Sequence, residues 1–195
     1  MKRLGVFRRL EALYDRMQRA YDQVAGTIDF TCQGCPQNCC TSYFQHHTYV
    51  EWAYMEKGVK ALPKSGQDEI QARAEAYVDR AKAMLARGER PDMMCPLNVD
   101  GLCGLYSHRL MICRLHGVPH TLQGRSGDAA EYPGCFRFQE TAEGRVDVPL
   151  LDRTPLYREL AALEMDFLGA KIKRLPRVNL TIAEMLVQDL QSLVL

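Results

Sequence analysis

The sequence contains no apolar run of about 18 residues, and this absence excludes an ordinary transmembrane helix. It also has little net charge, because 25 Lys and Arg offset 24 Asp and Glu to give a formal charge of +1. Without a positive excess, the chain lacks the electrostatic footprint of a dedicated nucleic-acid binder. Arg8, Arg9 and Glu11 stand where a secretory signal would need apolar residues. We therefore expect a cytoplasmic protein whose partners are neither membranes nor nucleic acids.

Several catalytic and nucleotide-binding motifs are also missing. The sequence has neither G-x-x-x-x-G-K-[ST] nor G-x-G-x-x-G, and no nucleophile signature surrounds its cysteines. The glycine-rich run 124–128 has no helical pattern after it, so a cofactor role there is not expected. One of His116 and His120, which stand near Cys113, could be a metal ligand. A surface or hydrogen-bonded histidine is the simpler interpretation for these two and for the pair His46-His47.

Cysteine, by contrast, is abundant, with eight residues in a chain of 195. Four of them lie within one short stretch, at Cys32, Cys35, Cys39 and Cys40, and four follow, at Cys95, Cys103, Cys113 and Cys135. Structural disulfides are rare in the reducing cytosol, where a set of thiols like this usually binds metal or carries redox chemistry. We predict that all eight are metal ligands, with disulfides as the alternative.

The early stretch has the spacing of a metal-binding loop. Two residues between Cys32 and Cys35 allow one tight turn to bring both sulfurs to one ion, and Gly34 can adopt the positive φ of such a turn. Cys39 follows closely enough to supply a third sulfur. The side chains of the adjacent residues Cys39 and Cys40 should diverge, so one ligates while the other serves a second ion or packs as a small apolar residue.

The later cysteines are spaced too widely for a zinc-finger knuckle. They would close long loops, and a shared metal would then hold residues 92–136 to the 32–40 loop. Buried thiolates need nearby cations and hydrogen-bond donors. Arg109 and Arg114 flank Cys113, so we expect them to stabilise the thiolates from outside the ligand set; the alternative is two solvated surface arginines.

These residues resemble the CxxCxxCC cysteine-cluster family, which is described as a zinc- or iron-chelating domain. The resemblance rests on the 32–40 run and on a second block, Cys95-Pro96-Leu97 followed by Gly101-Leu102-Cys103-Gly104-Leu105-Tyr106, Arg109 and Cys113-Arg114. It spans about residues 30–120. Leu110 replaces the proline that is usual after the arginine, and Leu115-His116 replaces an aromatic residue and a proline.

The resemblance implies a bacterial cytoplasmic protein that chelates zinc or iron, the latter as an iron–sulfur cluster. A flagellin lysine methylase resembles the same family, which suggests a second hypothesis: a metal-dependent protein methyltransferase acting on a peptide partner. The first hypothesis is a binding protein whose centre has a structural, sensing or partner-binding role.

The spacing does not decide between the two metals. Relative to the ferredoxin run C-x-x-C-x-x-C, this chain has one residue more between its second and third cysteines. Eight thiols also fit two four-thiolate zinc sites. Ligand softness alone slightly favours an iron–sulfur cluster, for example four-iron four-sulfur, over Zn²⁺.

Helical periodicity dominates the rest of the sequence. We expect a mainly α fold: a single small domain over 1–195, with a loop-rich cysteine module at 28–137 and flanking helices within 1–27 and 151–195. The expected helices are 5–25, 50–62, 67–87 with Ser65 as its N-cap, 155–174, and one from a capping box at Thr181 to about Leu193. Short strands are expected near 111–115 and 145–150.

Overall fold

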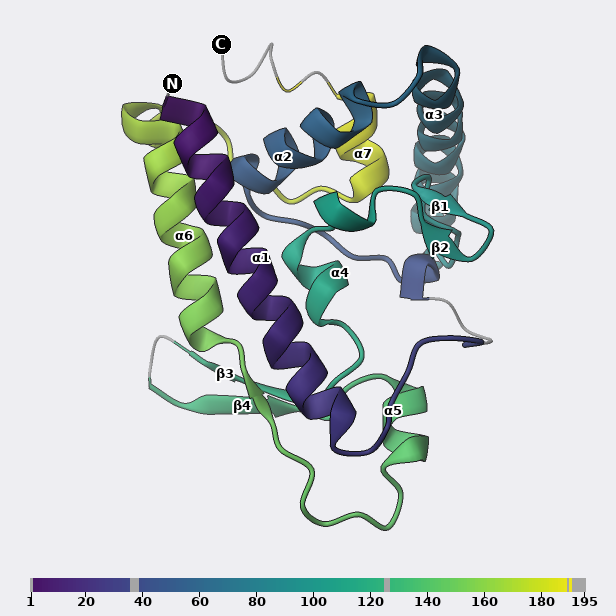
Figure 1. Ribbon diagram of the computed structural model, residues 1–195. Helices are drawn as coiled ribbons and strands as arrows, with labels where there is room; N and C mark the ends of the chain where they lie inside the picture. The colour runs from purple at the N-terminus through teal and green to yellow at the C-terminus, as the bar shows by residue number, and fades with distance from the viewer. Residues whose placement is uncertain (1, 36–38, 125–126, 189, 191–195) are drawn as a thin grey trace. The chain divides into compact units, whose positions relative to one another are not determined.

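The computed structural model confirms a mainly α fold (Figure 1). It describes residues 2–35, 39–124, 127–188 and 190. The chain forms two compact units. Unit 1 comprises Met1–Pro36 and Met111–Asp166, and unit 2 comprises Gln37–Leu110 and Phe167–Leu195. The boundary between the units falls inside the early cysteine stretch.

Unit 1 is built on the N-terminal helix α1 (Lys2–Gly26), which the apolar stripe of the sequence predicts. Helix α6 (Thr154–Leu168) lies beside it (Figure 1). Two ion pairs join the helices: Arg9 Nη1 lies 2.6 Å from Asp166 Oδ2, and Arg16 pairs with Glu159. Both pairs are exposed and contribute little, so the buried leucines and methionine of α1 provide most of the stabilisation: Leu10, Leu13 and Met17.

A small sheet and two short helices complete unit 1. Strand β3 (His120–Gln123) pairs antiparallel with β4 (Ala129–Tyr132) and parallel with β5 (Leu151–Asp152). Helix α4 (Met111–Leu115) packs against α1, and α5 (Phe136–Thr141) follows β4. Of the glycine-rich run 124–128, residues 125 and 126 lie outside the described residues, and Gly124 N donates a 2.8 Å hydrogen bond to Asp128 O.

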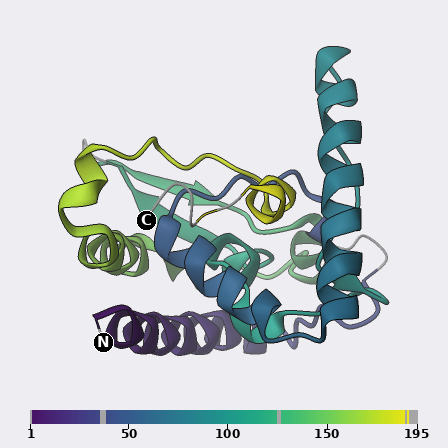
Figure 2. The same ribbon diagram turned by 90° about the horizontal axis from the view of Figure 1, so that it is seen from above.

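Unit 2 contains α2 (Tyr49–Lys60), α3 (Lys64–Ala86) and α7 (Ile182–Val187). Figure 2 shows α3 as one continuous, straight helix. The hairpin of β1 (Asn98–Val99) and β2 (Leu102–Cys103) lies beside α3, and Arg73 on α3 donates a 3.3 Å hydrogen bond to Asn98 O. Three short 3-10 helices, η1 (Cys39–Thr41), η2 (Tyr106–His108) and η3 (Gly169–Lys173), fill the connections.

The capping box at the start of α7 is confirmed. Thr181 Oγ1 accepts a 3.2 Å hydrogen bond from Glu184 N, while Glu184 Oε2 accepts a 2.7 Å bond from Thr181 N. The two bonds satisfy backbone donors that a helix N-terminus otherwise leaves open. The predicted end of this helix, near Leu193, lies outside the described residues. No helix in the described ranges is long and apolar enough to cross a bilayer.

Three local expectations are wrong. Helix α3 begins at Lys64 after Pro63, so Ser65 lies inside its first turn and is not the N-cap. Residues 111–115 form α4 instead of a strand, because one helical turn buries both Met111 and Leu115. Residues 145–150 form no strand, and the pairing with β3 falls instead on β5, immediately after them.

Candidate metal centre

All eight cysteines lie within the described residues, and none of them forms a disulfide. Cys32 is exposed and the other seven are partly buried. Four of them belong to each unit: Cys32, Cys35, Cys113 and Cys135 to unit 1, and Cys39, Cys40, Cys95 and Cys103 to unit 2. No thiol is therefore consumed by a disulfide, and each unit contains enough cysteines for a four-thiolate site.

In unit 2, the Cys40 thiol has the most distinctive environment. Its pKa is lowered to about 6, first by a hydrogen bond from the Cys39 side chain and then by the Asn98 amide and the charge of Arg109, while partial burial opposes the shift. This shift favours the thiolate, which is the form that binds metal. The 3-10 turn η1 brings the adjacent Cys39 and Cys40 side chains together, although the sequence indicated divergence.

The backbone brings the later cysteines of unit 2 to the same place. Cys95 N donates a 2.9 Å hydrogen bond to Cys40 O, and Asn98 N donates one of 2.9 Å to Cys95 O. Asn98 is also the strand partner of Cys103 in the β1–β2 hairpin. Asn98 is thus linked to three of the four thiol-bearing residues in this unit.

Asn98 itself has an incomplete set of hydrogen bonds. Its Oδ1 accepts a 3.0 Å bond from Gly101 N, which holds the hairpin turn. Its Nδ2 is buried and has no acceptor within full hydrogen-bond distance, although the amide approaches Cys40 closely enough to lower the pKa of that thiol. The amide is therefore placed to donate to a thiolate at Cys40.

A tyrosine in unit 2 also lies near a thiol. The pKa of Tyr77, on α3, is raised to about 12, mainly by burial and then by the negative charge of Cys95. The phenol therefore keeps its proton throughout the neutral range. Tyr77 also packs in the apolar cluster of α3 with Ala74 and Ala81, so its ring is part of the core of unit 2.

In unit 1, the early loop and the segment around Cys135 are tied together. Cys35 N donates a 3.2 Å bond to Cys32 O, and Gly34 has φ +67°, as the C-x-x-C spacing predicts. Tyr21 Oη lies 3.5 Å from Cys32 Sγ. The backbone oxygen of Gln33, in the same loop, accepts a 3.0 Å bond from Arg137 on α5.

Cys135 makes hydrogen bonds through both its backbone N–H and its side-chain sulfur. Its N donates a 2.8 Å hydrogen bond to Gly117 O, and its Sγ accepts one of 3.4 Å from Phe138 N. Tyr21 also reaches this region, because a Cβ placed on Gly117 would lie only 2.9 Å from Tyr21 Oη. Tyr21 therefore links the neighbourhood of Cys32 to the neighbourhood of Cys135.

Replacing Gly134 by alanine should displace Cys135 and destabilise unit 1. Gly134 has φ +82°, and a Cβ there would meet Gly117 O at 2.5 Å and Pro119 N at 2.9 Å. Strain and collision with fixed backbone together should cost roughly 2–4 kcal/mol. Gly144→Ala is the matched control, because Gly144 has φ +77° but open space around it. Urea unfolding that gives equal losses for both variants would contradict the close approach.

The two arginines that flank Cys113 in sequence lie in different units and have different partners. The Arg109 guanidinium lies 4.9 Å from the Tyr106 ring centroid, and its charge lowers the pKa of Cys40. Arg114 lies 4.0 Å over the Tyr14 ring, in a cation–π arrangement. Both side chains are partly buried, so neither is a fully solvated surface arginine.

The histidines near the thiols have structural environments of their own. His120 stacks on Tyr132 with ring centroids 4.6 Å apart, and burial, followed by the charge of Arg153, lowers its pKa to about 4. His47 Nδ1 lies 3.4 Å from Val178 O. These contacts support the simpler interpretation of both residues as hydrogen-bonded or packed side chains.

The thiols are not already grouped around a common point. Within the described ranges, no set of three or more Cys, His, Asp or Glu side chains is arranged to hold a metal ion. The surroundings nevertheless fit a thiolate centre, since the buried Asn98 Nδ2 lies near Cys40 and the pKa of that thiol is lowered. Loading with metal would therefore require the cysteine side chains to reorient within backbone segments that are already adjacent.

Two residues that help to build these surroundings were not identified from the sequence. Asn98 is visible only as part of the turn-forming run Asn98-Val99-Asp100-Gly101, which signals a hairpin but not an amide beside a thiol. Tyr21 is visible only as part of the apolar stripe of α1, and its hydroxyl gives no sequence signal. Both depend on tertiary contacts between segments distant in the chain.

The chain matches no protein-family model, no curated protein and no solved structure. The resemblance to the cysteine-cluster family therefore stays a prediction based on motif order. The chain also departs from the motif that names the family. That motif has two residues between its second and third cysteines, whereas three residues separate Cys35 from Cys39.

Proposed function

We propose that this chain is a metal protein that holds Zn²⁺ or an iron–sulfur cluster through cysteine thiolates. The centre would stabilise the loop-rich segments and serve a structural, sensing or protein-binding role. Eight reduced thiols suit a reducing compartment, so we place the protein in the cytoplasm. When bound, the metal would supply Lewis acidity, or electron transfer in the case of a cluster.

The observation that carries this proposal is the environment of Cys40. A thiol whose pKa is lowered to about 6, beside a second thiol and the Asn98 amide, is suited to ligate a soft cation. A buried packing cysteine would instead have its pKa raised by apolar surroundings. Arg109 further offsets the negative charge that such a centre accumulates.

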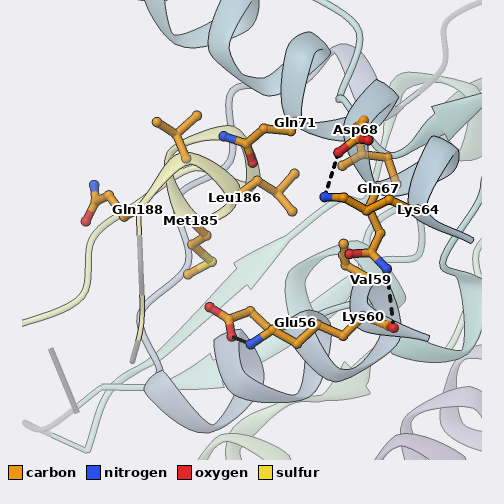
Figure 3. A pocket seen from close by; sticks show the side chains of 12 residues that line it. Glu56, Val59, Lys60, Lys64, Gln67, Asp68, Gln71, Met185, Leu186 and Gln188 are labelled. Atoms are coloured by element: carbon orange, nitrogen blue, oxygen red, sulfur yellow. Dashed lines mark hydrogen bonds and ion pairs between the residues drawn. The ribbon is translucent and has the colours of Figure 1, made fainter. Parts of the chain in front are cut away.

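The enzyme hypothesis would gain support from a pocket beside the thiols. A cavity of about 400 Å³ opens in unit 2 between α2, α3 and the end of α7, and its lining includes no cysteine (Figure 3). Its rim is charged, with Lys60 paired to Glu56 and Lys64 paired to Asp68, each at 2.8 Å. This cavity therefore gives no support to a methyltransferase-like reaction at the cysteines.

Replacing Asn98 by alanine should weaken metal binding by roughly 10–100-fold, the range typical of residues that hydrogen-bond to metal ligands. The variant removes the amide that lowers the pKa of Cys40 and the acceptor for Gly101 N. Asn179→Ala is the matched control, because Asn179 is an exposed residue of the same unit. Competition with a chromophoric chelator measures both affinities, and equal affinities would exclude a role for the amide.

Anaerobic purification, followed by a visible spectrum and elemental analysis, tests the proposal as a whole. A brown protein with iron and acid-labile sulfide identifies a cluster, and a colourless protein with stoichiometric zinc identifies a zinc centre. A protein that contains neither, and that takes up neither after reconstitution under reducing conditions, would refute the proposed function.

A further inference from the structure

Each unit contains four of the eight cysteines. In sequence order, the first two and the last two belong to unit 1, and the four between them belong to unit 2. The early stretch is split between Cys35 and Cys39, so its first pair lies in unit 1 and its second pair in unit 2. The later cysteines are divided as well, with two in each unit. Four thiolates are the full ligand set of a structural zinc site and of a cubane cluster.

Building on the proposed function, we infer that the protein carries two separate four-cysteine metal centres, one in each unit. Cys32, Cys35, Cys113 and Cys135 would form the centre of unit 1. Cys39, Cys40, Cys95 and Cys103 would form the centre of unit 2.

The contacts within unit 2 support a centre of its own. The Cys39 and Cys40 side chains interact directly, and Cys95 N donates to Cys40 O at 2.9 Å. Cys103 joins them through its strand pairing with Asn98, whose side-chain amide lies near Cys40. These four residues therefore belong to one connected group of short loops and turns.

The contacts within unit 1 support a second centre with other donors. The Cys32 loop is joined to the Cys135 segment through Arg137, which donates to Gln33 O at 3.0 Å. Tyr21 Oη lies 3.5 Å from Cys32 Sγ, and Phe138 N donates to Cys135 Sγ. Cys113 lies on α4, which packs against the same helix that carries Tyr21.

Coordination number also favours two centres over one. A zinc ion takes four thiolates, so a single centre would leave four of the eight cysteines without a metal. Four thiolates on one divalent ion leave a net charge of about −2, which hydrogen-bond donors near each set can offset: Asn98 in unit 2, and Tyr21 and the Phe138 amide in unit 1.

The number of ions that each set holds distinguishes the arrangements. The full-length chain would be reconstituted with Zn²⁺ under reducing conditions and compared with two matched double variants. Cys32→Ser/Cys135→Ser removes two thiols from unit 1, and Cys40→Ser/Cys95→Ser removes two from unit 2. We expect about two zinc ions on the unsubstituted chain and about one on each double variant, by elemental analysis of desalted protein.

Each alternative outcome has a definite meaning. One zinc on the unsubstituted chain, lost completely in both double variants, would show a single shared site and overturn this inference while leaving the proposed function intact. An unsubstituted chain that binds no metal would refute the proposed function itself. If a double variant fails to fold, native mass spectrometry of the unsubstituted chain still decides, because a mass shift of one zinc overturns the inference and of two supports it.

Discussion

Removing the metal from the reduced protein is expected to lower its free energy of unfolding by several kcal/mol. Structural zinc contributes apparent binding free energies of roughly 10–16 kcal/mol in small domains, and most of this is folding free energy. The loss should be greatest where few apolar contacts hold the chain. In unit 2 this is the β1–β2 hairpin, where Leu102 is 77% exposed. Helix α3, by contrast, buries Ala74, Tyr77 and Ala81 in an apolar cluster.

Amide hydrogen exchange measures this difference directly. After treatment with a strong chelator, the amides of η1 and of the β1–β2 hairpin should exchange much faster, while those in the centre of α3 change less. The control is the same chelator saturated with zinc beforehand, which separates metal removal from direct effects of the reagent. Equal protection in the treated and control samples would show that no metal organises these segments.

The buried His46 should make the folded protein lose stability as the pH falls. This side chain is 1% exposed, and neither of its ring nitrogens has a hydrogen-bond partner. Its backbone is fixed by the bridge to Leu180, with a 2.8 Å bond from His46 N to Leu180 O. Burial, with a smaller contribution from the charge of His47, lowers the pKa of His46 to about 3. The ring is therefore neutral in the folded protein.

The direction of the pH dependence follows from this shift. Because the folded pKa lies below the unfolded value of about 6.5, the unfolded chain binds the proton more readily. Stability is fully present above about pH 6.5 and falls by up to about 1.4 kcal/mol for each pH unit below it, towards pH 3. We expect a loss on the order of 4 kcal/mol by about pH 3.5. His46→Leu should remove this slope and, by removing two unsatisfied nitrogens, stabilise the protein at pH 7 by roughly 1–3 kcal/mol.

Trp52 provides the measurement, because it is the only tryptophan, is 1% exposed, and belongs to the same unit as His46. In chelator-treated, reduced protein, its fluorescence during urea unfolding should give a steep loss of stability between pH 6.5 and about 4 in the unsubstituted chain, and a shallow one in His46→Leu. His47→Leu, at an exposed neighbouring position, is the control and should keep the steep loss. The same steep pH dependence in His46→Leu would contradict the account of His46.

The sequence predicted the long helices because their apolar residues recur with the helical period over many turns. The stripe of α1 and the capping box at Thr181 are both local patterns, and both are confirmed. The short elements were harder, since Met111–Leu115 is an apolar run that fits a strand or a helical turn equally well. Only burial of Met111 and Leu115 on one side decides the matter, and burial depends on the rest of the fold.

The candidate site divides in a similar way. The cysteines and the turn at Gly34 are legible from residue type and spacing. The split between Cys35 and Cys39 is not, because it depends on which later segment each pair meets. The buried Nδ2 of Asn98 and the hydroxyl of Tyr21 likewise acquire their surroundings through residues far away in sequence. Sequence patterns therefore propose the ligands, and tertiary structure shows the groups that surround them.

The most direct test of the central claim is X-ray absorption spectroscopy at the metal edge of the anaerobically purified, full-length protein. Cysteine ligation predicts a first shell of sulfur alone, four per ion, at roughly 2.3 Å for zinc. A first shell dominated by nitrogen or oxygen would show that the thiolates do not hold the metal and would contradict the account.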